Sequence, residues 1–192
     1  MKSLSNLALI ALGMATVWVG CTPAAFEGEI GSEALGGMGT AFFDASDDES
    51  GVNYLFFASP GWSCEELQVA IANDTYPAMS DPDEVYTVAT FLIYEYSSES
   101  PIDYTSKTGD YTVVDGYVDA LNLAEGSLYT IASFGYRNNS ETTEAYYGAE
   151  NGTLTVTKVD LKSSVSGEFQ LSLSTADIIE GSFTAKRCDL PD

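Results

Sequence analysis

The chain has 192 residues, of which 29 are Asp or Glu, seven are Lys or Arg and none is His, so its formal net charge is −22. A surface this acidic repels nucleic acid, which proteins bind through Lys and Arg. Without imidazole, a Ser-His-Asp or Cys-His catalytic site cannot form, and zinc and copper lose their usual nitrogen ligand. Carboxylate chemistry, calcium binding or a role without any chemistry remain.

The N-terminus has the pattern of an export signal. Lys2 precedes an apolar run over residues 7–19, and acidic residues begin only after Cys21. A helix of that length reaches roughly 20 Å, less than the roughly 30 Å of a bilayer's hydrocarbon core. We therefore expect a cleaved signal peptide over residues 1–20, with a membrane-spanning anchor as the alternative. All 29 acidic residues then belong to the exported part.

The end of this leader, VWVGC over residues 17–21, resembles the lipobox of bacterial lipoprotein precursors, in which a small residue precedes an invariant cysteine. Gly20 and Cys21 fit that motif, and Trp18 stands where the family usually has Leu. The resemblance implies that Cys21 carries lipid. Thr22 in the next position, rather than Asp, implies delivery to the outer membrane of a Gram-negative cell. An ordinary secretory signal with an incidental cysteine is the alternative.

Two cysteines remain when Cys21 is assigned to lipid. In an oxidising compartment, a disulfide between Cys64 and Cys188 is the natural pairing. Two separate buried thiols are the alternative. No CxxC pair occurs, so neither a thioredoxin-like site nor a zinc knuckle is indicated.

The mature chain divides into two parts by composition. Residues 21–37 are rich in Gly and acidic residues, which predicts a flexible tether. Residues 38–192 have the length of one globular domain with a single core.

Short runs of alternating apolar and polar residues fill that domain and predict strands. They cover residues 40–44, 52–58, 85–96, 111–114, 117–123, 128–136, 153–158, 169–173 and 181–185. The long run over 85–96 is apolar on both sides, which predicts a central strand covered on both faces. Asp115-Gly116 predicts a tight hairpin turn, and Asn151-Gly152 is expected to precede the strand 153–158.

Residues 66–72 allow two interpretations. Leu67, Val69 and Ile71 alternate with smaller or polar residues, and we prefer a strand because β-branched residues hold this period of two. The alternative is a short helix, because Ser63 and Glu66 have the spacing of a capping box.

Many strands without a strong helix predict an all-β fold, a single antiparallel β-sandwich or barrel-like domain. Its closing segments, which begin at Gly152, Ser166 and Gly181 and end at Cys188, resemble those of small β-domain lipoproteins of Gram-negative bacteria. That resemblance brings no activity with it.

Candidate ligand groups are few. Asp44, Asp47, Asp48 and Glu49 form an acidic turn that could supply oxygen ligands to calcium. Their spacing fits an EF-hand poorly, because Glu49 stands where that loop needs Gly. A solvated acidic turn is therefore the preferred interpretation. We expect no other cofactor.

Tyrosines beside carboxylates suggest a second possibility, a carbohydrate-binding surface. The tyrosines concerned are Tyr86, Tyr94, Tyr96, Tyr136, Tyr146 and Tyr147. The competing interpretation is that they fill half-buried sheet faces. Glycoside hydrolysis by two carboxylates is compatible with the absence of histidine, but the sequence identifies no pair.

The sequence thus predicts a lipid-anchored, non-enzymatic envelope domain with a structural or surface-binding role. A carbohydrate-binding or glycan-active β-domain is the alternative. The expected partners are the membrane, through the lipid, and a protein or glycan that the sequence does not identify.

Overall fold

The computed structural model describes residues 24–30, 33–45, 51–59, 61–73, 86–99, 103–137, 145–173, 175 and 177–191. Its strands are β1 (Ala24–Ile30), β2 (Glu33–Ala45), β3 (Val52–Ser59), β4 (Tyr86–Glu95), β5 (Asp103–Tyr104), β6 (Gly109–Val113), β7 (Leu128–Arg137), β8 (Ala145–Asp160), β9 (Ser164–Leu173) and β10 (Ile178–Arg187). Two short helices, α1 (Cys64–Ala72) and α2 (Gly116–Ala120), complete the fold. The predicted all-β class is confirmed.

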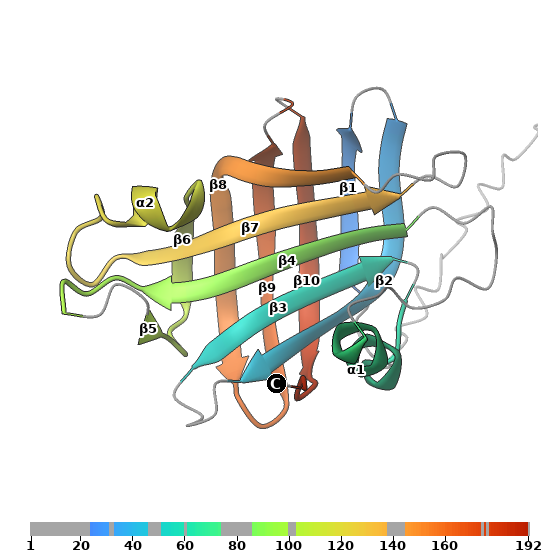
Figure 1. Ribbon diagram of the computed structural model, residues 1–192, viewed down its shortest axis with the longest axis horizontal. Helices are drawn as coiled ribbons and strands as arrows, with labels where there is room; N and C mark the ends of the chain where they lie inside the picture. Colours follow the sequence, from blue (N-terminus) through green and yellow to red (C-terminus); the bar gives the residue numbers. More distant parts are fainter. Residues whose placement is uncertain are drawn as a thin grey trace, which may run out of the picture.

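The strands form one sheet that returns to its own beginning. The order is β3-β2-β1-β10-β9-β8-β6-β7-β4-β5, and β3 also pairs with β4. In Figure 1 the strands β2, β3, β4 and β7 cross in front of β8, β9, β10 and β1 at a steep angle, so the sheet makes two layers. Most pairs are antiparallel as predicted, but β6 with β7 and β10 with β2 pair in parallel over two residues each.

Strand β8 takes part in both layers because it bends. Its first residues pair with β7 and its later residues with β6 and β9. The register shifts between Ala149 and Asn151, next to Gly152, whose φ is +139°. Asn151-Gly152 therefore lies inside a strand and does not precede one as expected, because a bend in a long strand needs the same conformational freedom as a turn.

Apolar side chains fill the space between the two layers. The ring centroid of Phe57 lies 5.2 Å from that of Phe91, 5.3 Å from that of Phe169 and 4.9 Å from that of Phe183, all with edge contacts. These four rings come from β3, β4, β9 and β10, so they join the front layer to the back. The strands predicted over 169–173 and 181–185 are confirmed, and their apolar residues Phe169, Leu171, Leu173, Phe183 and Ala185 belong to this core.

A second, smaller apolar cluster lies on the other side of β4 and β7. Tyr94, Val114, Ala120 and Tyr129 are buried there, with Ala120 supplied by α2. Strand β4 is thus covered on both faces and flanked by β3 and β7, as the sequence predicts for a central strand.

The prediction of a strand over residues 66–72 is wrong. This segment is the helix α1, and its capping box is complete. The Ser63 backbone N–H donates to Glu66 Oε2 at 2.7 Å, and the Glu66 N–H donates to Ser63 Oγ at 3.2 Å. Satisfying the free N–H groups of the first turn outweighs the strand preference of Val69 and Ile71.

The prediction of a hairpin turn at Asp115-Gly116 is also wrong. The strand β6 ends at Val113, and Gly116, with φ +80°, begins α2 where a strand over 117–123 was expected. The left-handed conformation that makes this dipeptide a good turn also allows it to start a helix, and burial of Ala120 holds that helix on the sheet.

The flexible tether expected over residues 21–37 needs correction. Residues 24–30 form β1, which pairs with β10 and with β2, and β2 itself begins at Glu33. Glycine-rich composition suggested a linker, but strand pairing from both sides fixes β1 in the sheet.

Among the described residues, no helix is long and apolar enough to cross a membrane.

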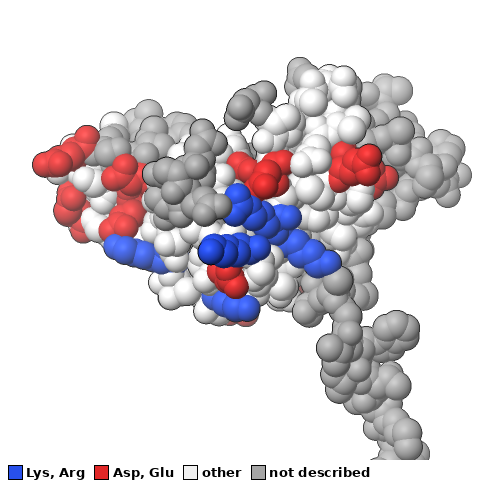
Figure 2. Space-filling model, turned by 90° about the horizontal axis from the view of Figure 1, so that it is seen from below, with Lys and Arg blue, Asp and Glu red and all other residues white. Residues whose placement is uncertain are grey.

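Charge is unevenly distributed over the surface. Figure 2 shows the molecule from below, where Lys and Arg side chains gather over the lower end of the back layer. Four of the chain's seven basic residues lie here: Lys158 near the end of β8, Lys162 in the turn between β8 and β9, and Lys186 and Arg187 at the end of β10.

Candidate functional site

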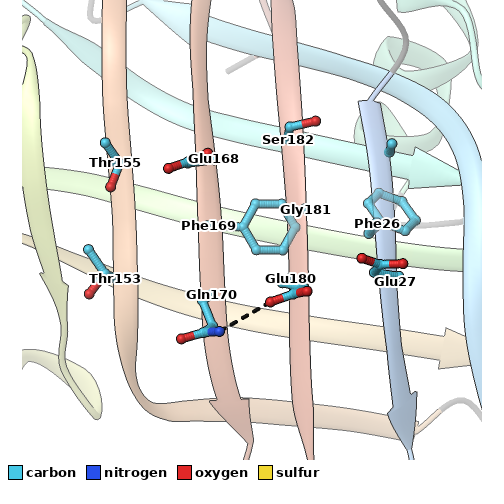
Figure 3. Close-up of a pocket in the computed structure, with 11 residues that line it drawn as sticks. Phe26, Glu27, Thr153, Thr155, Glu168, Phe169, Gln170, Glu180, Gly181 and Ser182 are labelled. Atoms are coloured by element: carbon cyan, nitrogen blue, oxygen red, sulfur yellow. Dashed lines mark hydrogen bonds between the residues drawn. The ribbon is translucent and has the colours of Figure 1, made fainter.

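The outer face of the back layer carries a hollow of about 650 Å³, which spans β8, β9, β10 and β1 (Figure 3). Alternation along each strand decides which side chains reach it, because successive residues point to opposite faces of a sheet. The outward, polar side chains are those of Glu27, Thr153, Thr155, Glu168, Gln170, Glu180 and Ser182.

Strand register arranges these side chains in two rows across the sheet. In the first row, Thr153 lies opposite Gln170, Gln170 opposite Glu180, and Glu180 opposite Glu27. The second row runs from Thr155 through Glu168 and Ser182 to Ala25. The hollow is thus a regular array of carboxylate, amide and hydroxyl groups at the spacing of neighbouring strands.

The floor of the hollow is backbone and the edges of core rings. Phe26 and Phe169 are buried and point toward the interior. Gly181 lies between them without a side chain, and a Cβ there would be 2.6 Å from the Ala25 carbonyl oxygen and 2.7 Å from Cζ of Phe169. The absence of a side chain at Gly181 therefore lets the Phe169 ring pack directly against the strand.

Hydrogen bonds link the polar groups of the array. Gln170 Nε2 donates to Glu180 Oε2 at 3.1 Å (Figure 3). Beside the hollow, Thr155 Oγ1 donates to Asp110 Oδ1 at 2.8 Å, which adds a carboxylate from β6. Most of the remaining groups are acceptors, so the face suits a ligand that donates hydrogen bonds or carries positive charge.

Glu27 and Glu180 are the carboxylate pair that the sequence could not identify. Directly opposed residues of an antiparallel pair have Cβ atoms about 4.5–5.5 Å apart, so the two carboxyl groups can come within the roughly 5–10 Å that two-carboxylate glycoside hydrolysis uses. Both side chains are exposed on an open face. A general acid in such an enzyme instead needs apolar surroundings that keep one carboxyl protonated. The geometry therefore favours binding over hydrolysis.

None of the predicted site residues that the structure describes lines this hollow. Cys21, Asp47, Asp48 and Glu49 fall outside the described residues. Asp44 is described, and its two oxygens accept bonds from the Leu190 N–H at 3.0 Å and from Asn53 Nδ2 at 3.2 Å. Its carboxylate ties the C-terminal segment to β2 and β3. Among the described residues, no group of three or more Asp, Glu or Cys is arranged to hold a metal ion.

The tyrosines do not form an exposed platform where they are described. Tyr94 is buried and stacks on Tyr104 with ring centroids 5.6 Å apart, and Tyr96 and Tyr147 are partly buried. The side chains of Tyr86, Tyr136 and Tyr146 are not among those that the structure describes. Of the predicted tyrosines, Tyr94, Tyr96 and Tyr147 thus pack against the apolar clusters of the sheet, in agreement with the competing interpretation for these three.

The predicted disulfide is confirmed. Cys64 at the start of α1 is bonded to Cys188, directly after β10, with their Cα atoms 5.6 Å apart. The Cys188 N–H also donates to the Phe43 carbonyl oxygen at 2.8 Å. The bond fixes α1 and the end of the chain on the outside of β2.

The array around Glu27, Glu168 and Glu180 was not predicted from the sequence. Alternation alone places Glu168 and Gln170 outward, but only the register between strands distant in sequence brings them beside Glu27. Comparison of the chain with family models, curated proteins and solved structures gives no match.

Proposed function

We propose that this protein is an exported, lipid-anchored domain of the bacterial envelope that binds or supports other envelope components and catalyses no reaction. The observation that carries the proposal is the disulfide between Cys64 and Cys188. Such bonds persist in oxidising compartments outside the cytoplasm. This pairing leaves Cys21, directly after the lipobox-like Gly20, as the cysteine available for lipid.

The arrangement of the core supports an external binding role. The strand order closes into a ring, which favours the barrel-like alternative over an open sandwich. Its interior is occupied by buried apolar side chains such as Phe57, Phe91 and Leu171. A ligand or partner would therefore bind at the outer surface, where the hollow across β8, β9, β10 and β1 offers a polar array.

Replacing the cysteine tests the anchor. Full-length Cys21→Ser protein, expressed in a Gram-negative host, should move from the membrane fraction to the periplasmic fraction and lose incorporation of labelled palmitate. The neighbouring Thr22→Ser variant, which keeps the cysteine, is the matched control and should stay membrane-bound. Retention of Cys21→Ser protein in membranes after a salt wash would contradict the lipid anchor.

A carbohydrate-binding role is a second candidate, favoured by the carboxylate, amide and hydroxyl rows of the hollow. These groups can bond to sugar hydroxyls, although Phe26 and Phe169 are too buried to stack on a sugar ring. A glycan array followed by calorimetry tests this role. Glu180→Gln should weaken any binding, whereas Glu150→Gln, exposed elsewhere on β8, should not. Equal glycan binding by both variants would exclude the hollow as the binding site.

A further inference from the structure

The lower end of β8, β9 and β10 is a basic patch on an acidic protein. We call Lys158, Lys162, Lys186 and Arg187 the basic end. Lys158 lies near the end of β8, Lys162 in the turn to β9, and the other two finish β10. Figure 2 shows Lys and Arg gathered over this end. Four of the chain's seven basic residues thus lie together, although acidic residues outnumber basic ones fourfold.

Strand register explains how these side chains share one surface. Lys186 lies opposite Ser164, which lies opposite Asp160, and Lys158 lies opposite Ser166 in the neighbouring row. The register of β8 shifts between Val156 and Lys158. This bulge gives Lys158 the outward position opposite Ser166 and leaves Val159 packed against the core.

Among the described residues, the four basic side chains of this end outnumber the two acidic ones that lie between them, Asp160 and Asp189. Asp160 is held within its own turn, because Oδ2 accepts from Ser163 Oγ at 2.7 Å and Oδ1 from the Lys162 N–H at 3.1 Å. Asp189 pairs with Arg187, Oδ1 to Nε, at 2.6 Å. The side chains of Lys158, Lys162 and Lys186 are exposed.

Strand β1 begins on the side of the sheet that faces the basic end. Strand β1 runs antiparallel to β10, and Ala25 lies opposite Ser182. From Ala25 back to Ala24, where it begins, β1 therefore follows the direction of β10 from Ser182 toward Lys186. Cys21 is four residues from Ala25, as Lys186 is from Ser182, and four extended residues span about 13 Å. The chain length thus allows Cys21 to reach the level of Lys186.

We propose that the basic end rests on the anionic phospholipid headgroups of the leaflet that holds the Cys21 acyl chains. This inference depends on the lipid anchor proposed above. The acyl chains supply attachment, and the basic end sets the orientation, with each basic side chain near an anionic surface strengthening contact roughly fivefold. Carboxylates elsewhere, including those of the hollow, are repelled by the same surface and keep the other faces turned away.

Lysine footprinting of the lipidated protein tests the orientation. The protein is reconstituted into phosphatidylcholine vesicles with and without phosphatidylglycerol and treated with a membrane-impermeant acetylating reagent, and modification of each lysine is measured by mass spectrometry. Lys158, Lys162 and Lys186 should react several times more slowly on phosphatidylglycerol vesicles, and added salt should remove the difference. Lys107, which pairs with Glu95 elsewhere on the surface at 2.6 Å, is the internal control and should not change.

A matched pair of variants strengthens the test. Lys162→Gln should reduce the protection of Lys158 and Lys186, whereas Lys107→Gln should leave it unchanged. Equal acetylation rates on both kinds of vesicle would overturn the inference. The same protection in detergent without vesicles would also overturn it and would indicate that protein covers these lysines. The same spectra show whether Cys21 carries acyl chains, so failure of the anchor and failure of the orientation give different results.

Discussion

Glu27 on β1 lies directly opposite Glu180 on β10, so two carboxylates face each other across an antiparallel strand pair. Like charges in this position destabilise a sheet. Glu27→Lys should therefore raise the free energy of unfolding, by up to about 1 kcal/mol at low salt. Urea unfolding at two salt concentrations measures this gain in unfolding free energy. Glu150→Lys is the control for the change in net charge alone, and an equal gain in both variants would contradict a pairwise effect.

The disulfide makes a separate contribution to stability. The Cys64→Ser/Cys188→Ser protein should lose about 2–4 kcal/mol of unfolding free energy, because the bond closes a long loop in the unfolded chain. Denaturant unfolding of both proteins gives the difference. Dithiothreitol should lower the midpoint of the wild-type protein to that of the variant and leave the variant unchanged. A variant as stable as the oxidised protein would be inconsistent with this contribution.

The capping box of α1 predicts a pH dependence. The Ser63 backbone N–H and Oγ both donate to Glu66 Oε2, and the bond from the backbone N–H is the main cause that lowers the Glu66 pKa below its ordinary 4.5. A carboxyl with a lowered folded-state pKa stabilises the fold above its unfolded pKa, and this is lost as the pH falls through the folded value. The Glu66→Gln variant should thus melt at a lower temperature than the wild type at pH 7, and this difference in melting temperature should narrow below pH 4.5.

Thermal melts across this range check the prediction, with Glu65→Gln on the same helical turn as the control. The control should show a smaller difference in melting temperature at pH 7, because the hydrogen bonds of the capping box join Ser63 to Glu66. A gap for Glu66→Gln that is constant from pH 7 to pH 3 would mean that the charge of Glu66 does not contribute.

Close packing beneath the hollow gives a fourth prediction. Gly181→Ala should destabilise the protein by about 1–3 kcal/mol, because the new Cβ would overlap the Ala25 carbonyl oxygen and the Phe169 ring. Gly148→Ala is the matched control on β8, since a Cβ there meets no atom within 4 Å. Calorimetric melting of both variants compares them. Equal melting temperatures would show that the floor of the hollow yields to the added methyl group.

Several features could be predicted from local sequence. Alternation of Phe169, Leu171 and Leu173 with polar neighbours indicated both the strand and its inward face, because side-chain direction in a strand has a period of two. The disulfide followed from counting cysteines once Cys21 was assigned to lipid. The errors at Glu66–Ala72 and at Asp115-Gly116 occurred where one short segment satisfies two local rules, and contacts with the sheet chose between them.

By itself, the sequence determined the all-β class, the direction of most strand side chains, the cysteine pairing and the strong negative charge, because each depends on composition or on neighbours along the chain. Tertiary structure decided that 24–30 joins the sheet, that Glu27 faces Glu180, and that Lys158 lies on the same end as Lys186. These relationships depend on register between strands far apart in the chain, which long-range packing sets. The net charge of −22 describes the whole chain, and register concentrates four of its basic residues at one end of β8 and β10.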